Sequence, residues 1–263
     1  MNELPLRIAD RNRPVAVAPK GWRNEPSIAR LCSFVDLTPS DLDALFALIE
    51  CEYPIKKRRE LVLDGYAFGK LGFIKDGFAV RYKLLRNGKR QIVSFLLPGD
   101  VIGLPGSFLD RAAHSVIAVT DMSLRVCALD AFVNLCCRGP KFALVLSWLA
   151  AQEAAVYAER IISIGRRTPT ERLAHFLLEI HSRLFAVGRA DELSCELPFT
   201  QEMMSDALGL SVPHLNRTLG QLRADDLVAT HERRFIFTDM PALAQLAQFQ
   251  PVNPARIPMP AFA

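Results

Sequence analysis

The spacing of hydrophobic residues changes twice along the chain. From about residue 53 to residue 129 the chain consists of short runs rich in Val, Ile, Phe and Tyr. The pair Asn87-Gly88 lies between YKLLR and KRQIVSFLL and predicts a two-residue hairpin turn with positive φ at both positions. Glycines punctuate the runs at intervals of 11 or 12 residues, at Gly65, Gly77, Gly88 and Gly99. This spacing is typical of an all-β sandwich or barrel.

Helical periodicity precedes and follows this β region. Before it, SFVDLTPSDLDALFALI predicts a helix capped by Thr38 or Ser40. After it, a long helix is expected over residues 141–164, because no Pro or Gly interrupts the pattern before Gly165. Its alanine-rich faces favour packing on the β region with one side and on a partner subunit with the other, although a core helix of a monomer fits the same pattern. The hinge GRRTP then leads into a helix TERLAHFLLEIHSRLF.

The stretch LPFTQEMMSDALGLSVPHLNRTLGQL, residues 197–222, predicts two helices joined by a tight turn. Thr200 can cap the first helix, and Gly209 can take the left-handed conformation that ends it. Ser211 can cap the second helix, whose first turn tolerates Pro213. The following LRADDLVATHERRFIFTD predicts a strand, a charged turn at residues 231–234 and a second strand. A hairpin in that place is the wing of a winged helix-turn-helix.

The second helix of this pair carries a face suited to reading DNA. Helical spacing directs its leucines inward and leaves its polar residues on other faces. Arginine can bond both acceptors of guanine in the major groove, and Asn or Gln can pair with adenine. Ser and His near a helix N-terminus suit phosphate. The candidate DNA-binding residues are therefore Thr200, Ser211, Pro213, His214, Asn216, Arg217, Gln221, Arg233 and Arg234.

Net charge gives this assignment little support. The 263 residues carry a net charge of +4, and acids roughly match arginines in the C-terminal region. Proteins that bind nucleic acid often carry their positive charge locally. One side of the region could still gather Arg166, Arg167, Arg217, Arg223, Arg233 and Arg234. A helical hairpin with no nucleic-acid role is the alternative.

Length and composition indicate a folded protein of about two domains. The start MNELPLRIADRNRP lacks a secretory signal, and the apolar run FALVLSWLAA is too short to span a bilayer, so we expect a cytoplasmic protein with no membrane partner. Six cysteines show no zinc-type spacing, which predicts no metal site and leaves a redox switch at Cys136-Cys137 as an alternative. P-loop, GxSxG, HExxH and GxGxxG motifs are missing, so we expect no enzyme and no catalytic residue.

This arrangement resembles the Crp/Fnr family of bacterial transcription regulators. The resemblance covers residues 27–250 and is specific in GDVIGLPGSFLDRAAHSV, RRTPTERLAHFLLEI and LPFTQEMMSDALGLSVPHLNRTLGQLRADDLV. It implies an α+β fold with a jelly-roll, cyclic-nucleotide-binding-like domain, a long dimerisation helix and a C-terminal winged helix-turn-helix that reads a palindrome. It also implies three partners: double-stranded DNA with a palindromic operator, a second copy of the chain, and RNA polymerase as a candidate.

The domain division expected from this resemblance has five parts. They are a flexible N-terminal arm at 1–26, an effector-type jelly roll at 27–139, the dimerisation helix at 140–165, the DNA-binding domain at 166–250 and a tail at 251–263. An effector pocket would lie near Leu104, His114, Ser115 and Tyr157, and Leu104 with Pro105 could fill it.

The chain departs from the cyclic-nucleotide-binding members of the family. Leu104 stands where they carry a Glu for the ribose, and His114-Ser115 stand where they carry Arg-Ser for the phosphate. Tyr157 and Ala158 replace a pair of hydroxyls that contact adenine. Leu cannot accept ribose hydroxyls, and a largely neutral His is a poor substitute for a fixed cation. We therefore do not expect cyclic AMP as the effector, and the effector, if one exists, is unknown.

The other branches of the family give further comparisons. The oxygen-sensing branch needs an N-terminal group of closely spaced cysteines for iron–sulfur binding, which this chain lacks. Haem binding through His114 would rest on a single His, so no cofactor is expected. Pro213 replaces a Glu that bonds cytosine in many relatives, while Arg217 matches the guanine-reading Arg. The chain looks most similar to FixK-like, rhizobial-type regulators, some of which act without a small effector. A signalling module whose C-terminal domain contacts protein is the alternative from another class.

Overall fold

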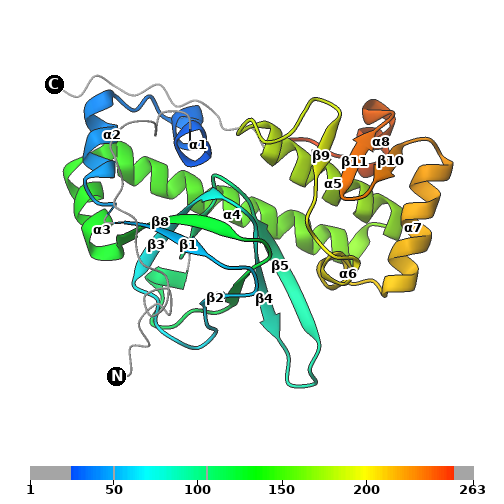
Figure 1. Ribbon diagram of the computed structural model, residues 1–263, viewed down its shortest axis with the longest axis horizontal. Helices are drawn as coiled ribbons and strands as arrows, with labels where there is room; N and C mark the ends of the chain where they lie inside the picture. The colour runs from blue at the N-terminus through cyan, green and yellow to red at the C-terminus, as the bar shows by residue number, and fades with distance from the viewer. Residues whose placement is uncertain (1–24, 50, 105, 252–263) are drawn as a thin grey trace. The chain divides into compact units, whose positions relative to one another are not determined.

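The structure is a computed structural model that describes residues 25–49, 51–104 and 106–251 (Figure 1). The expected N-terminal arm lies almost wholly outside this part of the chain, as do Pro105 and most of the expected tail. The described residues form two compact units, each treated separately below. Of the described residues, the first unit contains 25–81 and 95–153, and the second contains 82–94 and 154–251.

Two four-stranded sheets build the β region, which confirms the jelly-roll expectation. The strands are β1 (Cys51–Ile55), β2 (Glu60–Val62), β3 (Lys70–Asp76), β4 (Ala79–Leu84), β5 (Arg90–Leu96), β6 (Val101–Ile102), β7 (Ser115–Ala118) and β8 (Met122–Ala128). One sheet has the order β1-β8-β3-β6 and the other β2-β7-β4-β5. Strands β1 and β3 both pair antiparallel with β8, with Cys51 opposite Val126 and Leu71 opposite Cys127. Ile74, Leu124 and other apolar side chains from the strands are fully buried between them.

The β4–β5 hairpin is confirmed, but its turn differs from the predicted one. Gly88 has φ +79°, whereas Asn87 is not among the residues with positive φ. The amide of Leu85 donates to the carbonyl of Lys89 at 2.8 Å, and the amide of Gly88 donates to the carbonyl of Leu85 at 2.9 Å. Three residues therefore connect the strands, in a type I turn followed by a left-handed glycine. The two-residue prediction was wrong. A three-residue turn also needs a glycine with positive φ, so the Asn-Gly pair does not distinguish the two kinds of turn.

Helices pack against this β region within the first unit. They are α1 (Pro26–Phe34), α2 (Pro39–Phe46), the short η2 (Gly106–Phe108), α3 (Leu129–Arg138) and the first part of α4 (Pro140–Arg166). Thr38 caps α2 as predicted, in a capping box with Asp41, but α1 was not predicted as a separate helix. The rings of Phe34 and Trp148 stack with centroids 4.9 Å apart, which fixes α1 on α4. Within the described ranges, no helix has the length and apolar character needed to cross a bilayer.

The second unit is built on helix α5. Its elements are α5 (Pro169–Phe185), β9 (Ser194–Glu196), α6 (Gln201–Leu208), α7 (Val212–Ala224), β10 (Val228–His231), β11 (Arg234–Phe237) and α8 (Met240–Ala247), whose colours run from yellow-green to red in Figure 1. Thr168 caps α5 with a capping box to Glu171. The face of α5 with Phe176, Leu177 and Ile180 is fully buried. Strand order β10-β11-β9 gives the predicted wing a third strand, which the sequence did not reveal.

Candidate nucleic-acid interface

Helices α6 and α7 form a helix-turn-helix with the predicted boundaries. The hydroxyl oxygen of Thr200 accepts a hydrogen bond from the amide of Met203 at 3.2 Å, which caps α6. Gly209 ends α6 with φ +64°, a conformation that residues with a side chain seldom adopt. Ser211 caps α7 by accepting from the amide of His214 at 3.4 Å. The caps and the turn therefore fix the crossing of the two helices locally.

Helix α7 has one buried face and one exposed face. Leu215, Leu219 and Leu222 are buried as predicted. The exposed candidates are Pro213, Asn216, Arg217 and Gln221, while the side chain of His214 is half-buried. Exposed side chains at this spacing lie along one side of a helix. The structure therefore presents Asn216 and Arg217 to solvent together, as reading a DNA groove requires.

Two amide side chains of this motif have partners that the sequence did not reveal. The side-chain nitrogen of Asn216 donates to Oε1 of Gln201, the first residue of α6, at 3.1 Å. The side-chain nitrogen of Gln221 donates to both carboxylate oxygens of Asp225 at 2.9 and 3.0 Å. Gln201 follows the cap residue Thr200 directly, but no local pattern shows which side chain of α7 it meets. Gln221 is drawn toward the end of its own helix.

Arg233 and Arg234 of the wing were both predicted to bind DNA, but their side chains have different surroundings. His231 pairs with Arg234, so Glu232 and Arg233 form the turn, and the side chain of Arg233 is exposed. The guanidinium of Arg234 instead forms an ion pair with Asp191 and donates to the hydroxyl of Ser194. Arg233 is thus available to a ligand, whereas Arg234 fastens the wing to the segment before β9.

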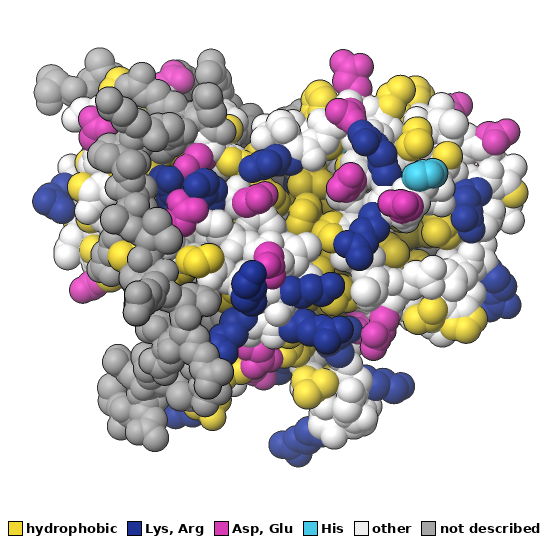
Figure 2. Space-filling view, viewed as in Figure 1, with side chains coloured by type: hydrophobic (Ala, Val, Ile, Leu, Met, Phe, Trp, Pro, Cys, Tyr) yellow, Lys and Arg dark blue, Asp and Glu magenta, His cyan; other side chains and the backbone are white. Residues whose placement is uncertain are grey.

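Arg167 and Arg223, two of the six arginines considered for a cluster, bond side chains of the second unit. Arg167 bonds Glu159 at 2.8 Å and the hydroxyl of Ser163 at 2.6 Å. Arg223 donates to the hydroxyl of Thr230 at 3.4 Å. On the face shown in Figure 2, basic and acidic side chains are interspersed. Of the six, Arg167 is half-buried, and the other five are exposed: Arg166, Arg217, Arg223, Arg233 and Arg234.

Arg172 anchors the helix-turn-helix to the preceding helices. Its guanidinium donates to the carbonyl of Leu208, at the end of α6, at 2.5 Å. It also donates to the carbonyls of Ile164 at 3.2 Å and Arg167 at 3.1 Å. Carbonyls at helix ends lack partners within their own helix, so one cation satisfies groups from two elements. No local sequence pattern indicated this role, because the contacts join residues up to 36 positions apart.

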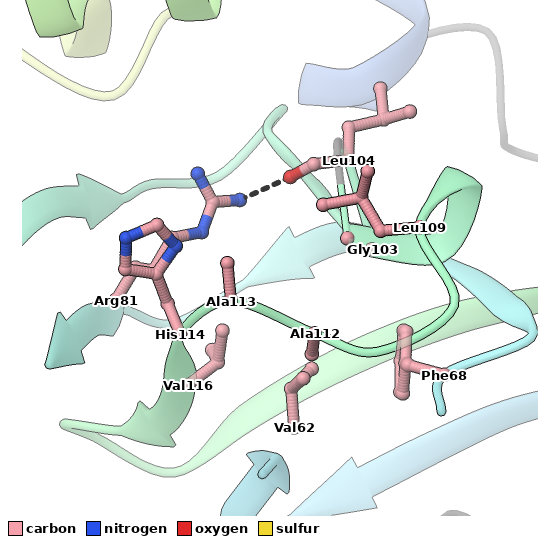
Figure 3. Close-up of a pocket in the computed structure, with 11 residues that line it drawn as sticks. Val62, Phe68, Arg81, Gly103, Leu104, Leu109, Ala112, Ala113, His114 and Val116 are labelled. Atoms are coloured by element: carbon pink, nitrogen blue, oxygen red, sulfur yellow. Dashed lines mark hydrogen bonds between the residues drawn. The ribbon is translucent and has the colours of Figure 1, made fainter. Parts of the chain in front are cut away.

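A pocket in the first unit contains part of the predicted effector site (Figure 3). Its volume is about 50 Å³, and apolar side chains such as Val62, Phe68 and Val116 line one side. Leu104 and His114 also line it, as expected. Ser115 is not among the lining residues, and its hydroxyl accepts from the amide of Asp64 at 3.1 Å. Tyr157 belongs to the part of α4 in the second unit, where its side chain is half-buried.

Arg81, which the sequence did not single out, dominates the polar side of this pocket. Its side chain is 4% exposed and forms an ion pair with Glu153 of α4. Its Nη2 donates to the carbonyl of Leu104 at 2.6 Å, drawn as a dashed line in Figure 3. The only sequence signal was an Arg in the otherwise apolar start of FAVRYKLL. A charge buried in a sheet is expected to be paired, and here the pair joins β4 to α4.

The residues present do not fit a cyclic nucleotide. Pockets for ligands of that size are commonly about 300–1,000 Å³, several times the volume of this one. Glu153 neutralises the buried cation that could have held a phosphate. Leu104 has no side-chain group that could accept a ribose hydroxyl.

The adjacent cysteines considered as a redox switch lie at the end of α3. Cys136 is half-buried and Cys137 is exposed. Burial raises the pKa of the Cys136 thiol, with the neighbouring Cys137 acting in the same direction. Because the thiolate is the reactive form, this environment disfavours reaction at Cys136.

Comparisons with known proteins agree with both units. The sequence profile of the Crp-like helix-turn-helix domain matches residues 171–246, and that of the cyclic nucleotide-binding domain matches residues 54–138. The chain is 29% identical to the anaerobic regulatory protein of Pasteurella multocida over 223 residues, which cover 84% of this chain and 81% of the relative. It is 31% identical to the transcriptional activatory protein AadR of Rhodopseudomonas palustris over 156 residues, covering 58% and 63%. The structure of FixK2 from Bradyrhizobium japonicum aligns with a TM-score of 0.68 and 28% identity, covering 74% of this chain and 96% of that one.

Proposed function

Because the chain belongs to the Crp/Fnr family of transcription regulators, we propose that it binds a palindromic operator as a homodimer and reads it with α7. The observation that carries this proposal is the exposed pair Asn216 and Arg217 on a capped helix of a helix-turn-helix. Asn and Arg are the side chains that pair bidentately with adenine and guanine in the major groove. A two-fold dimer would place its two α7 helices one turn of DNA apart, about 34 Å.

The exposed side of α4 supports the dimer. Ile161 is 73% exposed, and Ile162 and Ile164 are 45% and 42% exposed. Large apolar side chains left in water at one place are typical of a surface that another molecule covers. Six of the exposed positions of α4 are separated by alternating steps of four and three residues, as in a coiled-coil seam: Ser147, Ala151, Ala154, Ala158, Ile161 and Gly165. Ile162 and Ile164 lie beside this series. Small residues in that seam would allow two copies of α4 to approach closely.

We propose that DNA binding needs no cyclic nucleotide. The small pocket and the ion pair between Arg81 and Glu153 support this proposal. The name of AadR as an activatory protein supports transcriptional activation as the direction of control, with RNA polymerase as the partner. Since the proposed target is operator DNA, we place the protein in the cytoplasm. We also propose that the chain has the five parts given above, whose boundaries follow residues 26, 139, 165 and 250.

The proposal is tested by the salt dependence of binding to a duplex of about 30 base pairs, followed by fluorescence anisotropy. Contacts from cations to phosphates release counterions, so the logarithm of the association constant should fall linearly with the logarithm of salt. Sedimentation should give two chains per duplex, and Ile161→Glu should give a monomer that binds more weakly. A salt-independent or absent affinity would favour the protein-contact alternative.

A further inference from the structure

The last two turns of α4, residues 159–166, bury polar residues and expose apolar ones. The buried residues of these turns are Arg160 and Ser163, which are 8% and 3% exposed. The large apolar side chains are exposed instead: Ile161, Ile162 and Ile164. A helix that packed here through an apolar stripe would show the reverse pattern. The end of α4 is therefore joined to the rest of the second unit by polar contacts.

A buried ion pair between Arg160 and Glu179 connects α4 to α5. Nη2 of Arg160 donates to Oε2 of Glu179 at 3.2 Å, and the two side chains are 8% and 12% exposed. The other carboxylate oxygen of Glu179 accepts from Nη1 of Arg183 at 2.9 Å. The guanidinium of Arg160 lies over the ring of Phe176, 5.6 Å from its centre. Further contacts thus hold both members of the pair in place.

A second polar contact joins the same two helices one turn away. Nε2 of His175 in α5 lies 3.1 Å from Oε2 of Glu159 in α4. Hydrogen bonds weaken steeply when the donor angle bends, whereas the burial of apolar surface is non-directional. A buried ion pair is weak evidence for stability, but it can specify one arrangement of the groups around it. We therefore expect this joint to hold the angle between α4 and α5 within narrow limits.

The angle between α4 and α5 determines where α7 lies in a dimer. Helix α4 carries the proposed dimer seam, and only Arg167 and Thr168 connect it to α5. Helix α5 carries the buried face on which the second unit is built. One base pair more or fewer between two half-sites shifts them by about 3.4 Å and rotates them by about 35°. A dimer with a fixed angle at this joint therefore fits one spacing of half-sites.

We infer that Arg160 and Glu179 are positioning residues, which set the spacing of the half-sites by fixing the angle between α4 and α5. The inference rests on the proposed function, because it requires a dimer along α4 and α7 in the major groove. Arg160 is buried against α5, so its effect on DNA passes through the direction of α7.

Three full-length variants test the inference. Arg160→Met combined with Glu179→Met replaces the ion pair by apolar side chains of similar length, a change that is often neutral or stabilising. Arg160→Met alone leaves Glu179 with Arg183 as its partner. Arg183→Met is the matched control, because Arg183 bonds the same carboxylate from within α5.

Each protein is titrated, by fluorescence anisotropy, with the palindrome that the wild type selects from random DNA. The same duplex with one base pair more or fewer between the half-sites is titrated beside it. Wild type and Arg183→Met should lose about 100-fold in association constant on the altered duplexes, because only one half-site can then be bound. Both variants that contain Arg160→Met should lose less than about tenfold.

Two further measurements separate positioning from stability. The melting midpoint should fall in Arg160→Met and stay level or rise in the double variant, because the double variant leaves no buried charge of the pair. A loss of spacing preference that both variants share is then not an effect of stability. The preference for the base pair read by Arg217 should stay unchanged in both, because α7 itself is intact.

The outcomes separate the inference from the proposed function. An unchanged spacing preference in the double variant would overturn the inference and leave the regulator intact. A salt slope reduced by about one in Arg160→Met would also overturn it, because Arg160 would then contact a phosphate itself. A wild-type protein that binds every spacing equally, or selects no sequence, would overturn the proposed function and the inference with it.

Discussion

The guanidinium of Arg81 donates to the carbonyl oxygen of Leu104 at 2.6 Å. The same guanidinium pairs with Glu153 of α4. Leu104 lies in the segment that, in cyclic-nucleotide-binding members, carries the ribose contact. A cation of the chain itself thus occupies the polar side of this pocket, whose volume is about 50 Å³. Arg81 also joins a strand, a loop and a helix of the first unit.

Cyclic AMP should therefore not stabilise the protein. A ligand present at 100 times its Kd would raise the free energy of unfolding by about 2.7 kcal/mol. We expect no change of Tm in thermal unfolding with millimolar cyclic AMP. A Tm that rises with nucleotide concentration would contradict the poor fit of the pocket.

Replacing Arg81 should cost stability. Arg81→Met removes the cation that pairs with Glu153, and breaking a buried ion pair commonly costs about 3–5 kcal/mol. Because Glu153 is 18% exposed, we expect a loss at the lower end, near 3 kcal/mol, in urea unfolding. Arg86→Met, at the exposed hairpin tip, is the control and should change stability by less than about 0.5 kcal/mol. Equal effects of the two variants would refute the role given to Arg81.

The sequence predicted those parts of the fold that local chemistry determines. Thr38, Thr200 and Ser211 cap helices where expected, because a cap needs only its own neighbours in the chain. Strand β9 was missed because Ser194–Glu196 is short and gains its strand geometry by pairing with β11. Tertiary pairing of this kind leaves almost no trace in a local pattern.

The features of the candidate site likewise fall into those that a local pattern predicts and those that depend on tertiary packing. The exposed face of α7 followed from the spacing of Leu215, Leu219 and Leu222. The roles of Arg81, Gln201 and Arg234 did not follow, because their partners are between 15 and 72 positions away in the sequence. Those contacts depend on how separate elements pack, which one sequence does not reveal.

Arg217 should read one base pair in each half-site. Arg217→Ala should weaken operator binding by about 1–3 kcal/mol and relax the preference at that base pair. The change is measured by titrating the variant with the operator and with single-base substitutions of it. Equal weakening on operator and random DNA would instead assign Arg217 to phosphate.

The two arginines of the wing should behave differently. Arg233→Ala should weaken binding to all DNA sequences and reduce the salt slope by about one, as expected for a phosphate contact. Arg234→Ala should leave the salt slope nearly unchanged, because its guanidinium is held by Asp191 and Ser194. The partly exposed pair should contribute no more than about 1 kcal/mol to stability. Equal salt slopes for both variants would show that Arg234 also reaches the DNA.

His175 should make stability depend on pH. Burial lowers its pKa below 6.5, and Arg167 acts in the same direction against the opposing Glu179 and Glu159. A lowered folded-state pKa means that the folded protein resists protonation, so the stabilisation is full above the unfolded pKa and is lost as the pH falls through the folded pKa. Urea unfolding should show less stability as the pH falls below 6.5, and His175→Gln should reduce this dependence. An identical pH dependence in the variant would exclude His175 as its source.

The central claim is that α7 of a dimer reads a palindrome without a small effector. It is tested most directly by selecting bound sequences from random duplex DNA with the purified full-length chain and no added ligand. We predict recovery of a two-fold palindrome whose half-sites lie about one helical turn apart. Recovery of no sequence at low salt, or of a site without two-fold symmetry, would contradict the account.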